Sequence, residues 1–292
     1  AVRGSQHSNL SLQQTMRIPL TFAAMAATAI TAAAQQTLVI PEGASQTVEG
    51  PDSTTTPFDT TSGVRVVYLY DSTNFTNQGI NFPIVISGVR FRPNETTLST
   101  YTGGSIANFN ATVSTSQVRI DAPLVLNAST TTPLPFANVI GADAETFFSP
   151  GALTIGGFDG SLTPAGTPEP WNITLATNTT GGGGSLLYDP TSGASLAIEL
   201  NSDGVLDTLP VGAADAFFDG VQGRRIQDFN FNAPDATVDT NFCLVAEIIF
   251  NPAAGLFPGV SQDVTSGPSP LTVTFTVTTF TDDPAGVSLV EF

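Results

Sequence analysis

The sequence predicts an all-β protein, an antiparallel two-sheet sandwich that is jelly-roll-like. Three observations predict it. Thr, Val, Phe and Ile are abundant, 27 glycines and 21 prolines divide the chain into short segments, and no stretch after residue 34 has the i, i+3, i+4, i+7 apolar spacing of a helix. Many short strands between Gly, Pro, Asn and Asp turns are typical of sandwiches. No repeat of fixed period is visible, which argues against a propeller or a solenoid.

The first 34 residues predict export. Met16 and Arg17 give a short positive start, and the apolar and small residues that follow end in the small-residue cleavage pattern at Ala34. The apolar run is shorter than the roughly 20 residues that a membrane-spanning helix needs. We therefore expect residues 1–15 to be an upstream extension of the reading frame and residues 16–34 to be a signal peptide. A buried alanine-rich helix is the alternative.

The strands expected in the main domain, residues 35–258, follow from apolar alternation between turns. In Val89-Arg90-Phe91-Arg92, apolar side chains alternate with arginines, which predicts one dry face and one wet face, and residues 196–200 repeat the pattern. Residues 242–250 are apolar at nearly every position, which predicts a central strand. The side chains that we expect to be buried are Phe91, Ile198, Leu244 and Ile248. The expected strands are 37–40, 64–71, 84–92, 116–121, 152–155, 171–176, 185–188, 195–200, 215–218 and 242–250.

The residue types present exclude most catalytic chemistry. The chain has no Lys, and its one His, His7, lies upstream of the predicted signal peptide. The exported protein would therefore have no Ser-His-Asp or Cys-His pair, no His metal ligand and no Schiff-base lysine. Carboxylates, six arginines, four tyrosines and one cysteine remain.

Charge and cysteine content bound the partners. After cleavage, six basic residues face 25 acidic ones and the formal charge becomes −19. Such a surface repels nucleic acid and anionic membrane, keeps the protein soluble and monomeric, and suits divalent cations or neutral partners. A single cysteine leaves no internal disulfide, so the core has to be large enough alone. The apolar surroundings of Cys243 predict a buried thiol rather than a reactive one.

One segment has the pattern of a cation loop. Asn201, Asp203 and Asp207 place oxygen ligands at positions 1, 3 and 7 around a glycine, as calcium loops do, but position 12 is Gly212 where such a loop has a bidentate Glu. A turn between two strands is the alternative. Calcium is the one cofactor that the sequence suggests.

Two further features suggest ligands. Trp171, together with the tyrosines Tyr68, Tyr70, Tyr101 and Tyr188, predicts either a sugar-stacking platform or aromatic core packing. The one basic doublet, Arg224-Arg225, is expected to pair with nearby aspartates or to hold a carboxylate ligand.

Two parts of the chain resemble known families. Residues 66–75 (VVYLYDSTNF) and 86–93 (ISGVRFRP) are similar to the YDSSxF and IxGIxFR runs of uncharacterised exported bacterial proteins of the PEP-CTERM-associated type, and the similarity covers most of residues 64–250. This resemblance implies export and surface retention and supplies no activity. Residues 264–275 (VTSGPSPLTVTF) resemble the first strands of a PKD domain, an immunoglobulin-like sandwich. Because such a sandwich needs ~100 residues, residues 264–292 are expected to be its truncated start, or else a hairpin of the first domain.

Three function classes follow from the sequence. The leading one is a secreted or cell-surface non-enzymatic β-sandwich protein for display, adhesion or extracellular matrix, with polysaccharide or other surface proteins as partners. The second is a carbohydrate-binding module. The third is a glycosidase that works with carboxylates alone, which needs two acids about 5–9.5 Å apart in a cleft. The acids of this chain are scattered singly in turns, which argues against the third class.

Overall fold

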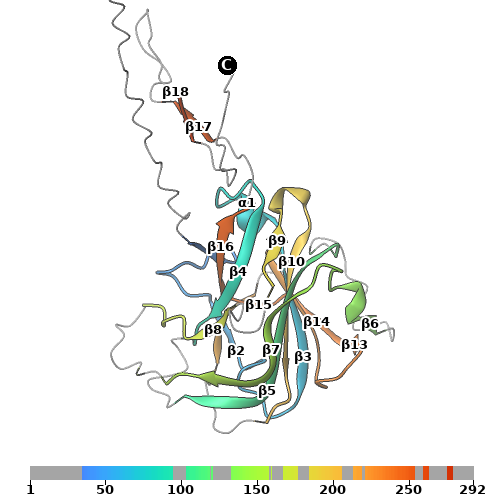
Figure 1. The fold of residues 1–292 in the computed structure, drawn as a ribbon. Coiled ribbons are helices and arrows are strands. Elements are labelled where there is room, and N and C mark those ends of the chain that lie inside the picture. The colour runs from blue at the N-terminus through green and yellow to red at the C-terminus, as the bar shows by residue number, and fades with distance from the viewer. Residues whose placement is uncertain are drawn as a thin grey trace, which may run out of the picture. The chain divides into compact units, whose positions relative to one another are not determined.

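The computed structural model describes residues 35–94, 103–118, 120, 133–157, 159, 167–176, 184–205, 213–218, 221–253, 259–262 and 275–278. These residues form several antiparallel sheets and confirm the predicted all-β sandwich class (Figure 1). The expected signal peptide and most of the PKD-like segment lie outside the described residues. Within the described ranges, no helix has both the length and the apolarity needed to cross a membrane.

Two large sheets contain most of the strands. The six-stranded sheet consists, in spatial order, of β14 (Val238–Thr240), β12 (Gly223–Asp228), β3 (Val64–Tyr70), β10 (Ser195–Ser202), β5 (Gly104–Ser116) and β7 (Glu145–Ile155). The five-stranded sheet consists of β1 (Gln36–Ile40), β16 (Ala246–Pro252), β4 (Ile84–Phe91) and β8 (Ile173–Ala176), with β9 (Leu186–Tyr188) also paired with β4. Neighbouring strands come from distant parts of the sequence, so few contacts in the sandwich are local.

Shorter elements complete the described structure. A three-stranded sheet joins β15 (Cys243–Leu244), β11 (Ala214–Phe217) and β2 (Asp52–Thr54). Two separate pairs are β13 (Asp235–Ala236) with β6 (Leu134–Pro135) and β17 (Gly259–Gln262) with β18 (Phe275–Thr278). The helical turns are α1 (Thr73–Thr76), η2 (Phe136–Asn138) and η4 (Pro190–Ser192).

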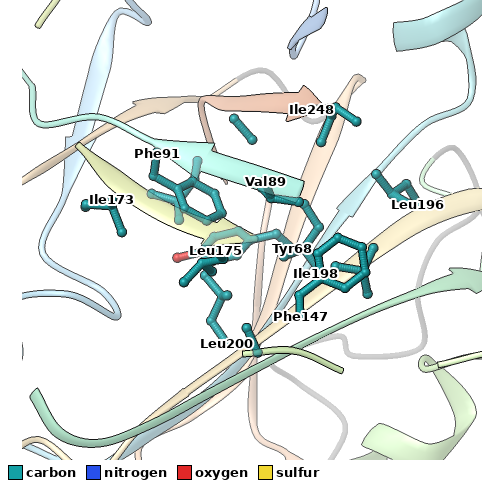
Figure 2. Packing of buried hydrophobic residues seen from close by; sticks show 14 of the residues in the cluster. Tyr68, Val89, Phe91, Phe147, Ile173, Leu175, Leu196, Ile198, Leu200 and Ile248 are labelled. Atoms are coloured by element: carbon teal, nitrogen blue, oxygen red, sulfur yellow. The ribbon is translucent and has the colours of Figure 1, made fainter. Parts of the chain in front are cut away.

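The main core takes apolar side chains from both large sheets (Figure 2). Leu196, Ile198 and Leu200 of β10 point into it at every second position, as the sequence predicted. All four side chains expected to be buried are 0 % exposed, namely Phe91, Ile198, Leu244 and Ile248. Because burying one such side chain contributes about 1.5–3 kcal/mol, a core of this size explains how the sandwich holds together without a disulfide.

The expectation that one face of β10 is exposed to solvent is wrong. Ala197 and Glu199, on the face away from the main core, are only 1 % and 7 % exposed. A second apolar cluster covers this face, and it includes Phe136 and Val139, which lie outside the two large sheets. The physical reason is that Ala197 and its neighbours on β3 are apolar, so the outer face also gains by being covered.

Strand positions differ from the expectation in several places. Instead of a strand at 116–121, the 13-residue strand β5 ends at Ser116. Its Gly, Asn, Ala and Ser residues have low strand propensity and hid it. The expected strand 242–250 is split into β15 and β16 at Val245, whose N–H donates to the carbonyl oxygen of Asp215 at 2.9 Å. Strands β12 and β14 were not predicted.

Candidate functional site

The two described residues of the predicted calcium triad, Asn201 and Asp203, each have a hydrogen-bond partner within the chain. The side-chain amide of Asn201 donates to the side-chain oxygen of Asn110 at 2.7 Å, and Asp203 Oδ1 accepts from the backbone N–H of Val205 at 3.0 Å. Asp203 thus caps a tight turn, the alternative that the sequence left open. Asp207 lies outside the described residues, so the full triad stays a prediction. In the part of the chain that the structure describes, no group of three or more His, Cys, Asp or Glu is placed to hold a metal ion.

The aromatic residues predicted to stack on sugars are mostly in the core. Tyr68, Tyr70 and Tyr188 are 0 % exposed, and each hydroxyl donates to a backbone carbonyl at 2.9 Å. These three tyrosines are therefore not available for stacking, and Tyr101 lies outside the described residues. Trp171 is half-buried and contacts a buried polar site, which includes Arg92.

That site is built on Arg92, which directly follows β4. Arg92 was expected on a wet face, but it is 0 % exposed, and this expectation is wrong. Its Nε donates to Asp215 Oδ2 at 2.7 Å, and Asp215 on β11 is also 0 % exposed. The guanidinium carbon lies 4.6 Å from the centroid of the Trp171 ring. Because a buried arginine needs both a counter-ion and hydrogen-bond acceptors, the chain brings a carboxylate and an aromatic face to it from two distant segments. We call Arg92, Asp215 and Trp171 the buried clamp.

The buried clamp holds the loop at residues 41–50 against the sandwich. Arg92 Nη1 donates to the carbonyl of Ser45 at 2.9 Å and Nη2 donates to the carbonyl of Val48 at 2.8 Å. Asp215 Oδ1 accepts from the backbone N–H of Gly50 at 2.9 Å. A Cβ at Gly50 would lie 2.1 Å from the carbonyl oxygen of Ala216, so only glycine allows this approach.

A hydrogen-bond chain extends the buried clamp across the outer face of the five-stranded sheet. Trp171 Nε1 donates to Gln46 Oε1 at 2.7 Å, and Gln46 Nε2 donates to Glu247 Oε1 at 2.6 Å. Glu247 Oε2 accepts from Arg90 Nη1 at 3.1 Å. One face of Trp171 is covered by Arg92 and its N–H is occupied, so this tryptophan serves the clamp rather than an open platform.

The environment of Asp215 decides what the buried clamp can do chemically. Burial raises the pKa of Asp215 to about 6, although the guanidinium of Arg92 and the N–H groups of Gly50 and Ala216 lower it. A carboxyl group with such a pKa can act as a general acid where a substrate reaches it. Here both carboxylate oxygens are bonded within the chain and the side chain has no exposed surface. The arrangement therefore suits anchoring and not proton transfer.

A similar arrangement lies on the outer face of the six-stranded sheet. Arg65 on β3 donates through Nε to Glu199 Oε1 at 2.8 Å and through Nη1 to the carbonyl of Ala233 at 2.8 Å. Its guanidinium carbon lies 4.4 Å from the centroid of the Phe136 ring. Glu199 Oε2 also accepts from the hydroxyl of Thr112 at 2.7 Å. The side chain of Arg65 is 25 % exposed and that of Glu199 is 8 % exposed. We call Arg65, Glu199 and Phe136 the half-buried clamp.

The basic doublet on β12 divides its roles. Arg224 forms an ion pair with Asp239 on β14. Pairing of the doublet with an aspartate was one of the two expectations from the sequence. Arg225 lies on the other side of the strand, where its guanidinium carbon is 4.8 Å from the centroid of the Phe242 ring.

Sequence reasoning missed the clamps because their members are far apart in the chain. Arg92 and Asp215 are 123 residues apart, and Arg65 and Glu199 are 134 apart. The sequence contains one partial signal, because arginines are rare in this chain and two of them alternate with apolar residues at 89–92. If the outer face of such a strand is covered, each arginine on it needs a carboxylate partner. No known protein family matches the chain, and searches among curated proteins and solved structures give no match either.

Proposed function

We propose that the protein is a secreted or cell-surface β-sandwich that works without catalysis, in display, adhesion or extracellular matrix. The observation that carries the proposal is the use of arginine. Four of the five arginines in the described ranges pair with carboxylates of the same chain, in Arg65–Glu199, Arg90–Glu247, Arg92–Asp215 and Arg224–Asp239. Each pair joins different strands or segments, so these charged groups connect parts of the sandwich to one another.

The position of β1 is compatible with the predicted cleavage. Strand β1 begins at Gln36, two residues after the cleavage position predicted at Ala34, and it pairs along its whole length with β16. A mature chain that starts there would keep every residue of this strand. The single cysteine, Cys243, is only 1 % exposed, which suits a compartment where an exposed thiol would be oxidised.

The two alternative functions have less support. A glycosidase needs two carboxyl groups that face a substrate, and the four carboxylates of the ion pairs face arginines instead. A carbohydrate-binding module based on Trp171 needs an open indole face, and Arg92 covers one face of this ring.

Export and cleavage test the location. We expect the chain expressed in a Gram-negative bacterium with residues 16–34 to be found outside the cytosol, with Gln35 or Gln36 at its N-terminus. A matched variant that begins with Met followed by residue 35 should stay in the cytosol with the same circular dichroism spectrum. Intact protein that still starts at Met16 in the cytosol would refute export.

Turnover tests the absence of catalysis. We expect the purified protein to release no reducing ends from a panel of neutral and acidic polysaccharides. Hydrolysis that is lost on replacing one Asp or Glu would overturn the non-enzymatic proposal and favour the glycosidase.

A structural calcium site at Asn201, Asp203 and Asp207 stays part of the proposal. If it exists, a chelator should lower the unfolding temperature, because a ligand that only the native state binds stabilises that state. Asp203→Ala should remove the dependence on chelator. A melting curve that chelator leaves unchanged in the native chain would reduce these residues to turn formers.

A further inference from the structure

One surface carries aromatic side chains that the core does not use. Phe218, which follows β11, is 59 % exposed, and Phe242, which precedes β15, is half-buried. Their ring centroids lie 6.3 Å apart at an interplanar angle of 55°. Nearby in the sequence, Val221 is 71 % exposed. We call Phe218 and Phe242 the aromatic pair. Phe218 exposes apolar surface next to a second aromatic ring, and contiguous apolar surface of this kind marks interaction sites more often than scattered single residues do.

Among the residues that the structure describes, the charged group beside the aromatic pair has no counter-ion. Arg225 stacks on Phe242, and its Nη1 donates to the hydroxyl of Thr54 at a long 3.3 Å. It is the only arginine of the described ranges without a carboxylate within ion-pair distance in those ranges. The hydroxyl of Tyr68 interacts with the guanidinium of Arg225, but burial raises the pKa of Tyr68 far above its usual range, so this hydroxyl stays neutral and is no counter-ion.

Two buried polar atoms at the same place also lack partners. Within the described ranges, Nε of Arg225 donates no hydrogen bond, and the hydroxyl of Thr240, which pairs with Arg225 across β12 and β14, makes none. A buried donor without an acceptor is costly, and in native proteins such a group usually indicates a missing partner. The charge of Arg225 fits a carboxylate, which is the counter-ion that guanidinium groups bind best.

We propose that the aromatic pair and Arg225 bind a saccharide unit that bears a carboxylate, with the C–H face of the sugar ring on Phe218 and its carboxylate on the guanidinium. A site that combines aromatic contact with one well-placed charged group is the usual composition for small-ligand recognition. The large negative charge of the protein does not prevent this contact, because at physiological salt charges are screened beyond about 8 Å. The inference rests on the proposed extracellular function, for which it names the partner, but binding is measured on purified protein and export is measured separately.

The test compares an acid with its own ester. Residues 35–292 are titrated by calorimetry with an oligogalacturonate and with the same oligosaccharide fully methyl-esterified, which keeps the rings and removes the charge. We expect the acid to bind at least tenfold more tightly than the ester, and we expect this ratio to fall as salt is raised. Phe218→Ala should weaken both ligands about tenfold. Phe229→Ala is the matched control, since Phe229 is 58 % exposed but lies after the far end of β12.

Arg225 is tested by the ratio of the two affinities. Arg225→Gln should bring the acid down to the affinity of the ester while leaving the ester unchanged, and Arg225→Lys should restore part of the difference. If Arg225→Gln does not fold, Phe218→Ala and the acid-to-ester ratio of the native chain still decide. No binding of either ligand at millimolar concentration, equal affinity for acid and ester, or binding that Phe218→Ala leaves intact would each overturn the proposal. Export of a chain that binds neither ligand would overturn this inference alone.

Discussion

The two arginine clamps have the same chemistry and differ in their contact with water. In each, an arginine in a strand or directly after one pairs with a carboxylate, stacks on an aromatic ring and donates to at least one backbone carbonyl of a covering segment. In the buried clamp both charged side chains are 0 % exposed, whereas in the half-buried clamp the arginine is 25 % exposed. The buried pair has therefore lost all of its hydration and the other pair only part of it.

This difference decides what each clamp contributes to stability. Removing two charges from water costs several kcal/mol per ion, and their attraction inside the protein roughly offsets that cost. The raised pKa of Asp215 agrees with this balance, because the effect of burial on the carboxylate exceeds the effect of the adjacent guanidinium. We infer that the buried clamp fixes one arrangement of the 41–50 loop more than it adds net stability. The half-buried clamp has a smaller desolvation cost and fixes its covering segment less strictly.

Breaking one partner of the buried clamp gives the largest expected effect. Asp215→Ala leaves Arg92 charged, buried and without its carboxylate, and such a loss costs about 3–5 kcal/mol of unfolding free energy. Urea denaturation followed by far-UV circular dichroism measures it. The double variant Asp215→Ala, Arg92→Met should recover more than half of the loss, because it removes the orphaned charge. A double variant that is less stable than the single one would show that the ion pair itself is strongly stabilising.

The pH dependence of stability sharpens the same contrast. Because the pKa of Asp215 in the folded protein, about 6, lies above its ordinary value of 3.8, the folded state takes up a proton where the unfolded state does not. Its contribution is fully present below about pH 4 and is lost as the pH rises through about 6, a change of about 2–3 kcal/mol. Other carboxylates titrate in this range, so the measured quantity is the difference in unfolding free energy between the native chain and Asp215→Asn. A difference that stays constant from pH 4 to pH 7 would contradict the raised pKa.

The half-buried clamp should respond less to the loss of its carboxylate. Glu199→Ala leaves Arg65 with partial access to water and with its bond to the carbonyl of Ala233, so we expect a loss of about 1–2 kcal/mol. The matched variant Thr112→Val removes only the second hydrogen bond to Glu199 and should cost less. Equal costs for Glu199→Ala and Asp215→Ala in urea denaturation would remove the distinction between the two clamps.

The sequence predicted the strands better than the layers. Alternation located β4 and β10 and placed Phe91 and Ile198 in the core, because a period of two residues is a local property. The same alternation assigned Arg92 and Glu199 to solvent-exposed faces, but both side chains are buried. Whether an outer face is covered depends on segments tens of residues away, such as the 41–50 loop over Arg92 and the Phe136 region over β10. Local pattern cannot contain that information.

The candidate site follows the same rule. Trp171 was singled out because it is the only tryptophan, yet its role depends on Arg92 and Gln46, which no spacing in the sequence connects to it. The calcium pattern at Asn201 and Asp203 is visible in the sequence because its residues are close together. Its alternative, a turn, describes the contact that Asp203 makes. Sites assembled from distant segments were missed for the reason that the covered faces were missed.

The smallest expected effect separates the two contacts of Trp171. Trp171→Phe keeps an aromatic face for Arg92 and removes only the bond from Nε1 to Gln46, whose exposed amide can bond to water instead. We expect a loss of about 0.5–1 kcal/mol. Trp171→Ala also removes the stacked face over a fully buried guanidinium, and the difference between the two variants should be about 1–2 kcal/mol, the range for a desolvated cation–π contact. Both are measured by urea denaturation with circular dichroism, because Trp171→Phe removes the only tryptophan fluorescence of the chain. If the two variants lose the same stability, Arg92 does not depend on the ring, and the buried clamp reduces to its ion pair and its bonds to the 41–50 loop.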